Sequence, residues 1–176
     1  MKRLLRAACF AAEKHADQRR KDACGTPYIN HPLAVAELLA RVGDVVDEDV
    51  LIAALLHDTV EDTNTTRNEI VTHFGESVAI LVMACTDDKS LPKSERKRLQ
   101  VELAPHKPEG AKLIKLADKT CNLHSLIHDP PESWSQQRKL EYVDWAEQVI
   151  AGLIGANSAL EKAAVDAIAS CRNAFA

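Results

Sequence analysis

Apolar residues recur every three to four positions along most of the chain, which is the spacing of amphipathic α-helices. No stretch alternates β-branched and polar residues, and no Asn-Gly or Asp-Gly pair marks a hairpin. The pattern therefore predicts an all-α protein of eight to nine helices. They are expected over approximately residues 2–17, 32–42, 47–58, 66–75, 76–86, 92–104, 111–126, 135–155 and 158–175.

One of these stretches, Val50 to Leu56, is apolar on almost every side. A helix without a polar face is usually buried, so we expect it at the centre of the molecule. A polar loop is expected after it, through Asn64. Thr66 and Glu69 then form the capping-box pattern that opens the next helix.

Composition narrows the class of protein further. The chain has 176 residues, of which 46% are apolar and 27% charged, so we expect one compact domain over residues 1–176. No apolar run approaches the roughly 20 residues that cross a bilayer, which argues against a membrane partner. The formal net charge of −4 argues against a nucleic-acid partner, because binding to phosphate backbones needs a basic surface.

The five cysteines are scattered and odd in number, and none forms a C-x-x-C pair. This usage is typical of a reduced, cytoplasmic protein rather than of a disulfide scaffold. We expect each cysteine to be a small buried apolar residue.

The candidate chemistry begins where the most apolar helix ends, at His57 and Asp58. A buried carboxylate is costly without a partner, and a bound cation would supply one. Glu61 and Asp62 follow four residues later, so they share a helix face with this pair if the helix continues for one turn. So many acids at one helix end repel each other unless a positive charge compensates.

Two more side chains complete a candidate metal site. His31 stands at the start of the second helix, and Asp118 is a lone acid in an apolar helical stretch. With His57 and Asp58 they make a set of two histidines and two aspartates from three helices. Imidazole and carboxylate together suit Mn²⁺, Fe²⁺ or Zn²⁺, and such a set leaves positions open for water and substrate.

This pattern resembles the signature of the HD-domain metal-dependent phosphohydrolases. The surrounding blocks resemble the hydrolase domain of the RelA/SpoT alarmone enzymes, and they cover residues 15–22, 25–32, 54–63, 73–75, 115–119 and 122–123. The segment 86–100 is most similar to that of the small stand-alone alarmone hydrolases, the type first recognised as metazoan SpoT homologues. Because the chain ends at residue 176, it has no room for a synthetase domain, and we expect hydrolysis only.

The resemblance implies removal of the 3′-pyrophosphate of (p)ppGpp, giving GDP or GTP and pyrophosphate. It implies that one Mn²⁺ per site is bound by four ligands, and that two acids position and deprotonate the attacking water. The ligands would be His31, His57, Asp58 and Asp118, and the acids Glu61 and Asp62. The substrate would be bound by Arg20, Lys21, Lys93, Asn122 and Tyr142.

Two other functions stay open at this point. The same metal site could remove a phosphate from another nucleotide such as NADPH, or the protein could be a nucleotide sensor without turnover. The intact acid pair argues against a sensor, which needs no water activation. A homodimer is compatible with the sequence, which does not reveal the oligomeric state. The remaining histidines are expected at the surface or at helix caps: His15, His73, His106, His124 and His128.

Overall fold

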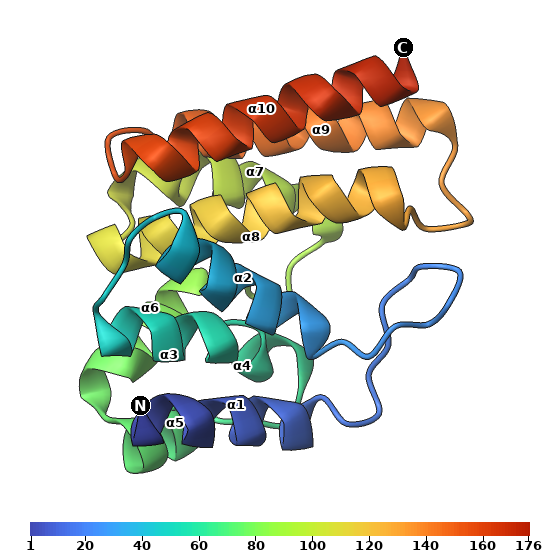
Figure 1. The fold of residues 1–176 in the computed structure, drawn as a ribbon. Coiled ribbons are helices and arrows are strands. Elements are labelled where there is room, and N and C mark those ends of the chain that lie inside the picture. Colours follow the sequence, from blue (N-terminus) through green and yellow to red (C-terminus); the bar gives the residue numbers. More distant parts are fainter.

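The computed structural model describes residues 1–176 and contains helices but no β-strand (Figure 1). Nine α-helices are longer than one turn, which confirms the predicted all-α architecture. In chain order the elements are α1 (Lys2–Lys14), α2 (Asn30–Arg41), α3 (Glu48–Leu56), α4 (Thr59–Asp62), α5 (Arg67–Phe74), α6 (Glu76–Cys85), α7 (Lys93–Leu103), the 3₁₀ helix η1 (Ala104–His106), α8 (Glu109–His128), α9 (Gln136–Ala151) and α10 (Ser158–Phe175). No helix is both long and apolar enough to span a membrane.

Helix α8 runs through the middle of the bundle (Figure 1). It packs against α9 and α10 on one side and against α2, α3 and α6 on the other. Helices α1 and α5 lie at the far edge from α10. Side chains on α8 are therefore enclosed by helices from both halves of the chain.

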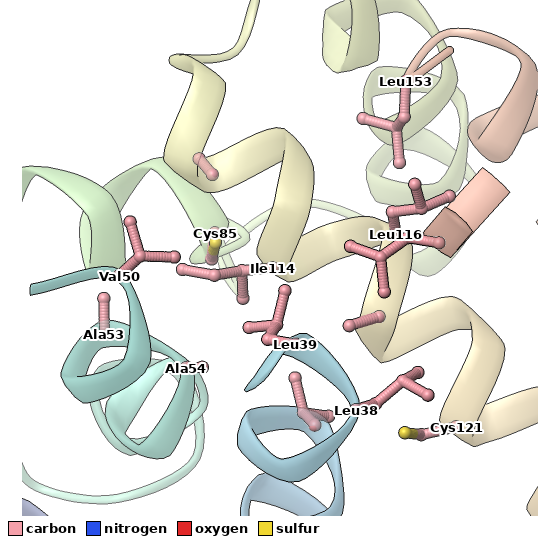
Figure 2. Packing of buried hydrophobic residues seen from close by; sticks show 14 of the residues in the cluster. Leu38, Leu39, Val50, Ala53, Ala54, Cys85, Ile114, Leu116, Cys121 and Leu153 are labelled. Atoms are coloured by element: carbon pink, nitrogen blue, oxygen red, sulfur yellow. The ribbon is translucent and has the colours of Figure 1, made fainter. Parts of the chain in front are cut away.

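The core is built mainly from aliphatic side chains on these central helices (Figure 2). Leu39 of α2 packs close to Ile114 of α8, and both are fully buried. Leu116 is also fully buried, and Leu153 packs above it. Each such side chain contributes about 1.5–3 kcal/mol by leaving water, so the core fixes the position of α8 firmly.

The region after α3 differs from the expected polar loop. Helix α3 ends at Leu56, and the chain turns once more as α4. The hydroxyl of Thr59 donates to the carbonyl oxygen of Leu56 at 2.7 Å, and the amide of Asp62 donates to the carbonyl oxygen of Asp58 at 2.8 Å. Residues 57 and 58 thus separate the two helical segments. Glu61 therefore lies on a separate turn rather than on a continuation of α3.

Residues 15–29 form an ordered loop between α1 and α2. Arg19 and Pro27 pair as an isolated antiparallel bridge, and the amide of Tyr28 donates to the carbonyl oxygen of Gln18 at 3.1 Å. Gly25 takes a φ of +58°, which few side chains tolerate, and this lets the loop turn back. The loop brings its basic and aromatic residues to the beginning of α2.

The cysteines correct one expectation. Cys85, Cys121 and Cys171 are buried as predicted, but Cys9 and Cys24 are exposed. Cys9 lies on the outer face of α1, and Cys24 lies in the loop before α2, where no second layer of the bundle covers them. All five are free thiols.

Candidate metal centre and active-site cavity

His57 follows the last residue of α3 and is almost completely buried. Its Nδ1 lies 2.7 Å from the carbonyl oxygen of Ala54. A carbonyl only accepts, so Nδ1 carries a hydrogen, and Nε2 presents a lone pair when the ring is neutral. This Nε2 is buried and has no hydrogen-bond partner in the protein, although it lies 3.1 Å from Oδ2 of Asp58. A buried donor atom left in this way is what a metal ligand requires.

Two other helices bring their side chains to the same point. Nε2 of His31, on α2, lies 3.1 Å from Oδ1 of Asp118, on α8, and 3.8 Å from Oδ2 of Asp58. Nε2 of His57 lies 3.9 Å from Oδ1 of Asp118. The donor atoms of His31, His57 and Asp118 all lie within 4.8 Å of one another. The four residues of the predicted set therefore converge.

The electrostatics of this point favour a cation. Burial alone would raise the pKa of Asp118, but Lys119 and His31 outweigh it and hold that pKa well below its usual value. Burial alone would lower the pKa of His57, but Asp58 outweighs it and raises the pKa to about 9. Both shifts mean that two ionised carboxylates attract positive charge into a buried space.

These observations fit a divalent metal ion. The two imidazoles offer nitrogen ligands and the two carboxylates offer oxygen ligands, and together they can coordinate one ion. The buried lone pair of His57 would gain a partner. The charge of the ion would replace the proton that the carboxylates otherwise attract.

A tyrosine that was not among the predicted site residues supports this group. The hydroxyl of Tyr28 donates to Oδ2 of Asp58 at 2.6 Å. Burial and the neighbouring Asp58 raise the pKa of Tyr28, so the hydroxyl keeps its hydrogen. The only signal in the sequence was the position of Tyr28 three residues before His31, in the same block.

Asn122 lies one turn after Asp118 on α8, as its spacing predicted. Its Nδ2 donates to Oδ1 of Asp118 at 2.6 Å, and its Oδ1 accepts from Nη2 of Arg20 at 3.1 Å. Arg20 is thereby tied to the metal-ligand group through one side chain. This contact links the basic loop to the candidate metal centre.

The two acids of α4 are held differently. Oε2 of Glu61 accepts from the backbone amide of Asp87 at 2.9 Å. Burial raises the pKa of Glu61 above its usual value. Asp62 pairs through Oδ1 with Lys89, and its Oδ2 accepts from Nε2 of Gln18 at 3.2 Å. Both acids are only partly exposed.

A cavity of about 690 Å³ opens over this site. This is the size that encloses a nucleotide-like ligand. Of the predicted site residues, its lining includes Arg20, Lys21, His31, Asp62, Asn122 and Tyr142. The lining does not include His57, Asp58, Glu61, Lys93 or Asp118, and Lys93 is exposed at the start of α7.

His15 corrects a further expectation, because it is buried and not at the surface. It is 2% exposed, and its Nδ1 lies 2.6 Å from Oε1 of Gln18. Its ring packs against that of Tyr28, with centroids 4.9 Å apart. His73, His106, His124 and His128 are exposed, as expected.

Comparison with known proteins identifies the family of this chain. The model of the HD domain family matches residues 7–145. The chain is 61% identical to guanosine-3′,5′-bis(diphosphate) 3′-pyrophosphohydrolase MESH1 of Xenopus tropicalis, over 90% of this chain and 88% of that protein. It is 60% identical to the Homo sapiens protein of the same name, over 91% and 89% of the two chains.

A solved structure extends the comparison to three dimensions. It is described as a metazoan ortholog of SpoT that hydrolyses ppGpp and plays a role in starvation responses. It superposes with a TM-score of 0.94 at 44% identity and covers 97% of this chain and 96% of its own. The chain therefore belongs to the HD-domain family, in the RelA/SpoT group of small metazoan SpoT homologues.

Proposed function

We propose that the protein is a metal-dependent (p)ppGpp 3′-pyrophosphohydrolase. The observation that carries this proposal is the convergence of His31, His57, Asp58 and Asp118 next to a cavity that has a basic wall and includes Asp62 in its lining. Relatives about 60% identical over nearly their whole length are named for this reaction.

We infer that the metal is Mn²⁺, one ion per site, held by His31, His57, Asp58 and Asp118. The mixed imidazole and carboxylate donors support this choice. When bound, such an ion supplies Lewis-acid stabilisation of the charge that develops on a phosphoryl oxygen.

Two acidic side chains of the protein then accept the proton of the attacking water. Water attacks the phosphorus bonded to the 3′ oxygen, that P–O bond breaks, and pyrophosphate carries away the oxygen of the water. The 3′ oxygen gains a proton from solvent and becomes the 3′ hydroxyl of GDP or GTP. Glu61 and Asp62 orient the water and accept its proton, which is worth typically ~10²–10⁴-fold in rate. The partial burial of Glu61 supports this role, because its raised pKa makes it a stronger base than an exposed glutamate.

The basic loop and α8 bind the substrate. Arg20 and Lys21 on the cavity wall attract its phosphates, and the Arg20 guanidinium can also stack on a purine. Asn122 and Tyr142 line the same cavity and face the nucleoside. Lys93 lies one turn before Lys97, whose ammonium is 6.0 Å from the ring centroid of Tyr142, so we place it at the cavity mouth for an outer phosphate.

We also propose a single domain over residues 1–176 and a cytoplasmic location. One cluster of buried side chains extends from Ala7 to Phe175, which supports the first proposal. Five free thiols support the second, because reduced cysteines persist in the cytoplasm.

A product assay tests the reaction. Purified, metal-stripped protein is given ppGpp with and without Mn²⁺, beside a His57→Ala/Asp58→Ala double variant. We expect GDP and pyrophosphate only from the parent protein with metal. Orthophosphate from NADPH, with ppGpp untouched, would instead indicate the phosphatase. Binding of ppGpp without any product would indicate a sensor.

A further inference from the structure

The side chain of Gln18 bridges two groups that are far apart in the sequence. Its Oε1 lies 2.6 Å from Nδ1 of His15, and its Nε2 lies 3.2 Å from Oδ2 of Asp62. His15 and Asp62 are 47 positions apart in the numbering (62 − 15). One amide group therefore connects the end of α1 to the acid of α4.

The donors and acceptors of these two hydrogen bonds determine which way the Gln18 amide faces. An ionised carboxylate only accepts, so the amide nitrogen of Gln18 must face Asp62. The amide oxygen must then face His15, and because that oxygen also only accepts, Nδ1 of His15 carries a hydrogen. A flipped amide would place its oxygen against the Asp62 carboxylate and lose the bond to Asp62.

Gln18 and His15 are both held in place by further contacts. The backbone amide of Gln18 donates to the carbonyl oxygen of His15 at 3.0 Å, and its carbonyl oxygen accepts from the amide of Tyr28 at 3.1 Å and from Nη1 of Arg19 at 2.9 Å. His15 is buried against the ring of Tyr28. Rigid support of this kind is what a precisely placed catalytic group requires.

His15 cannot reach the substrate. It is 2% exposed and does not line the active-site cavity, whereas Gln18 and Asp62 both do. The other oxygen of Asp62 pairs with Lys89, whose side chain is 49% exposed. Gln18 is thus the less exposed of the two partners that contact Asp62.

We propose that His15 and Gln18 are positioning residues that hold the Asp62 carboxylate in the orientation needed to accept a proton from water. His15 holds the oxygen end of the Gln18 amide in place, and the nitrogen end of the amide holds Oδ2 of Asp62. This inference rests on the proposed hydrolase function.

Three variants test the chain of contacts with ppGpp as substrate and Mn²⁺ saturating. Gln18→Met keeps the length of the side chain and removes the amide. His15→Phe keeps the ring against Tyr28 and removes the Nδ1 hydrogen. His15→Asn places an amide N–H close to the position of Nδ1. The matched control is Gln137→Met, since Gln137 is an exposed glutamine on α9 away from the site.

We expect Gln18→Met and His15→Phe each to lower kcat by about 10- to 100-fold, because small misplacements of a catalytic group have effects of this size. KM and the affinity for Mn²⁺ should change less than about threefold. His15→Asn should regain most of the lost kcat. The double variant Gln18→Met/His15→Phe should be no slower than Gln18→Met alone, since both changes remove one function.

Several results would overturn the inference. One such result is an unchanged kcat in Gln18→Met, and another is full additivity in the double variant. A third is a higher KM and a lower thermal stability with kcat preserved. Each would show that these residues do not act through Asp62. Absence of turnover in the parent protein would overturn the proposed hydrolase function itself. Turnover in the parent with no effect of the variants would overturn the positioning role alone.

Discussion

At the scale of single residues, the site depends on how each polar atom is already engaged. The carbonyl oxygen of Ala54 accepts a hydrogen bond from Nδ1 of His57, so Nε2 faces Asp58. The hydroxyl of Tyr28 in turn orients Asp58. The chemistry of the candidate metal centre is therefore prepared by groups that would not touch the ion.

Tyr28→Phe should weaken metal binding. The change removes the hydrogen bond to Asp58 and leaves the ring in place, and the loss of such a supporting contact typically lowers metal affinity about 10–100-fold. Titration of metal-stripped protein with Mn²⁺, followed by the signal of the free ion, measures this. Tyr142→Phe is the control, because the Tyr142 hydroxyl contacts none of the four ligands. Equal affinity in Tyr28→Phe and the parent would refute the orienting role of Tyr28.

The raised pKa of Glu61 predicts how the activity depends on pH. Burial raises its pKa, and a general base works only when ionised, so activity should be lost as pH falls through that raised pKa. The acidic limb of kcat/KM should therefore lie above the ~4.3 of an ordinary glutamate. Rates across the acidic range, with bound metal measured at each pH, separate this limb from loss of the ion. A fully loaded enzyme that stays active down to the ordinary glutamate range would contradict the assignment.

The residues that could be predicted from the sequence share one property: their residue types are unusual where they stand. His57 and Asp58 end an apolar helix, and Asp118 interrupts another. Gln18 and Tyr28 are ordinary residues for a polar loop, and each contacts a site acid that lies 30 or more positions away in the sequence. A long-range contact of this kind leaves no local pattern.

At the scale of elements, the break between α3 and α4 determines the site. The sequence predicted both the apolar helix and the acids after it. It did not predict the interruption between Leu56 and Thr59, because a side-chain bond to a preceding carbonyl, such as that of Thr59 to Leu56, competes closely with continued helix. The turn that results places Glu61 beside the amide of Asp87.

Asp47 caps α3 and should contribute to its stability. Its carboxylate accepts from the backbone amide of Asp49 at 2.9 Å. Asp47→Ala should lower the free energy of unfolding by about 0.5–2 kcal/mol, as loss of such caps does, without changing kcat under conditions where the protein is folded. Urea denaturation measures this. Glu132→Ala, an exposed acid in a loop, should change the free energy of unfolding by less than about 0.5 kcal/mol. Equal stability of the two variants would disprove the cap.

At the scale of the whole molecule, α8 joins the two halves of the bundle. One side of it packs on α10 and the other on α2, and it carries both Asp118 and Asn122. The all-α class followed from periodicity alone, but the central place of α8 did not. The apolar α3, which the sequence predicted to be central, is buried and packs against α1, α2, α6 and α8. The longer α8 shares the centre because it packs against helices on two sides.

Leu116→Ala should destabilise the protein as a unit. The side chain is fully buried on α8 two residues before Asp118. Its truncation leaves a cavity and should cost about 2–5 kcal/mol. Leu103→Ala, at a site that is 49% exposed, is the matched control and should cost far less. Comparable midpoints of urea unfolding for the two variants would contradict the packing of α8.

Our proposal requires that one metal ion, held by His31, His57, Asp58 and Asp118, is needed for hydrolysis of ppGpp in the cavity. The most direct test titrates metal-stripped protein with Mn²⁺ while bound ion and pyrophosphate release from ppGpp are measured in the same sample. We predict that both rise together and level off at one ion per chain, and that Asp118→Asn lacks both. Hydrolysis without bound ion, or a fully bound ion without hydrolysis, would contradict the claim.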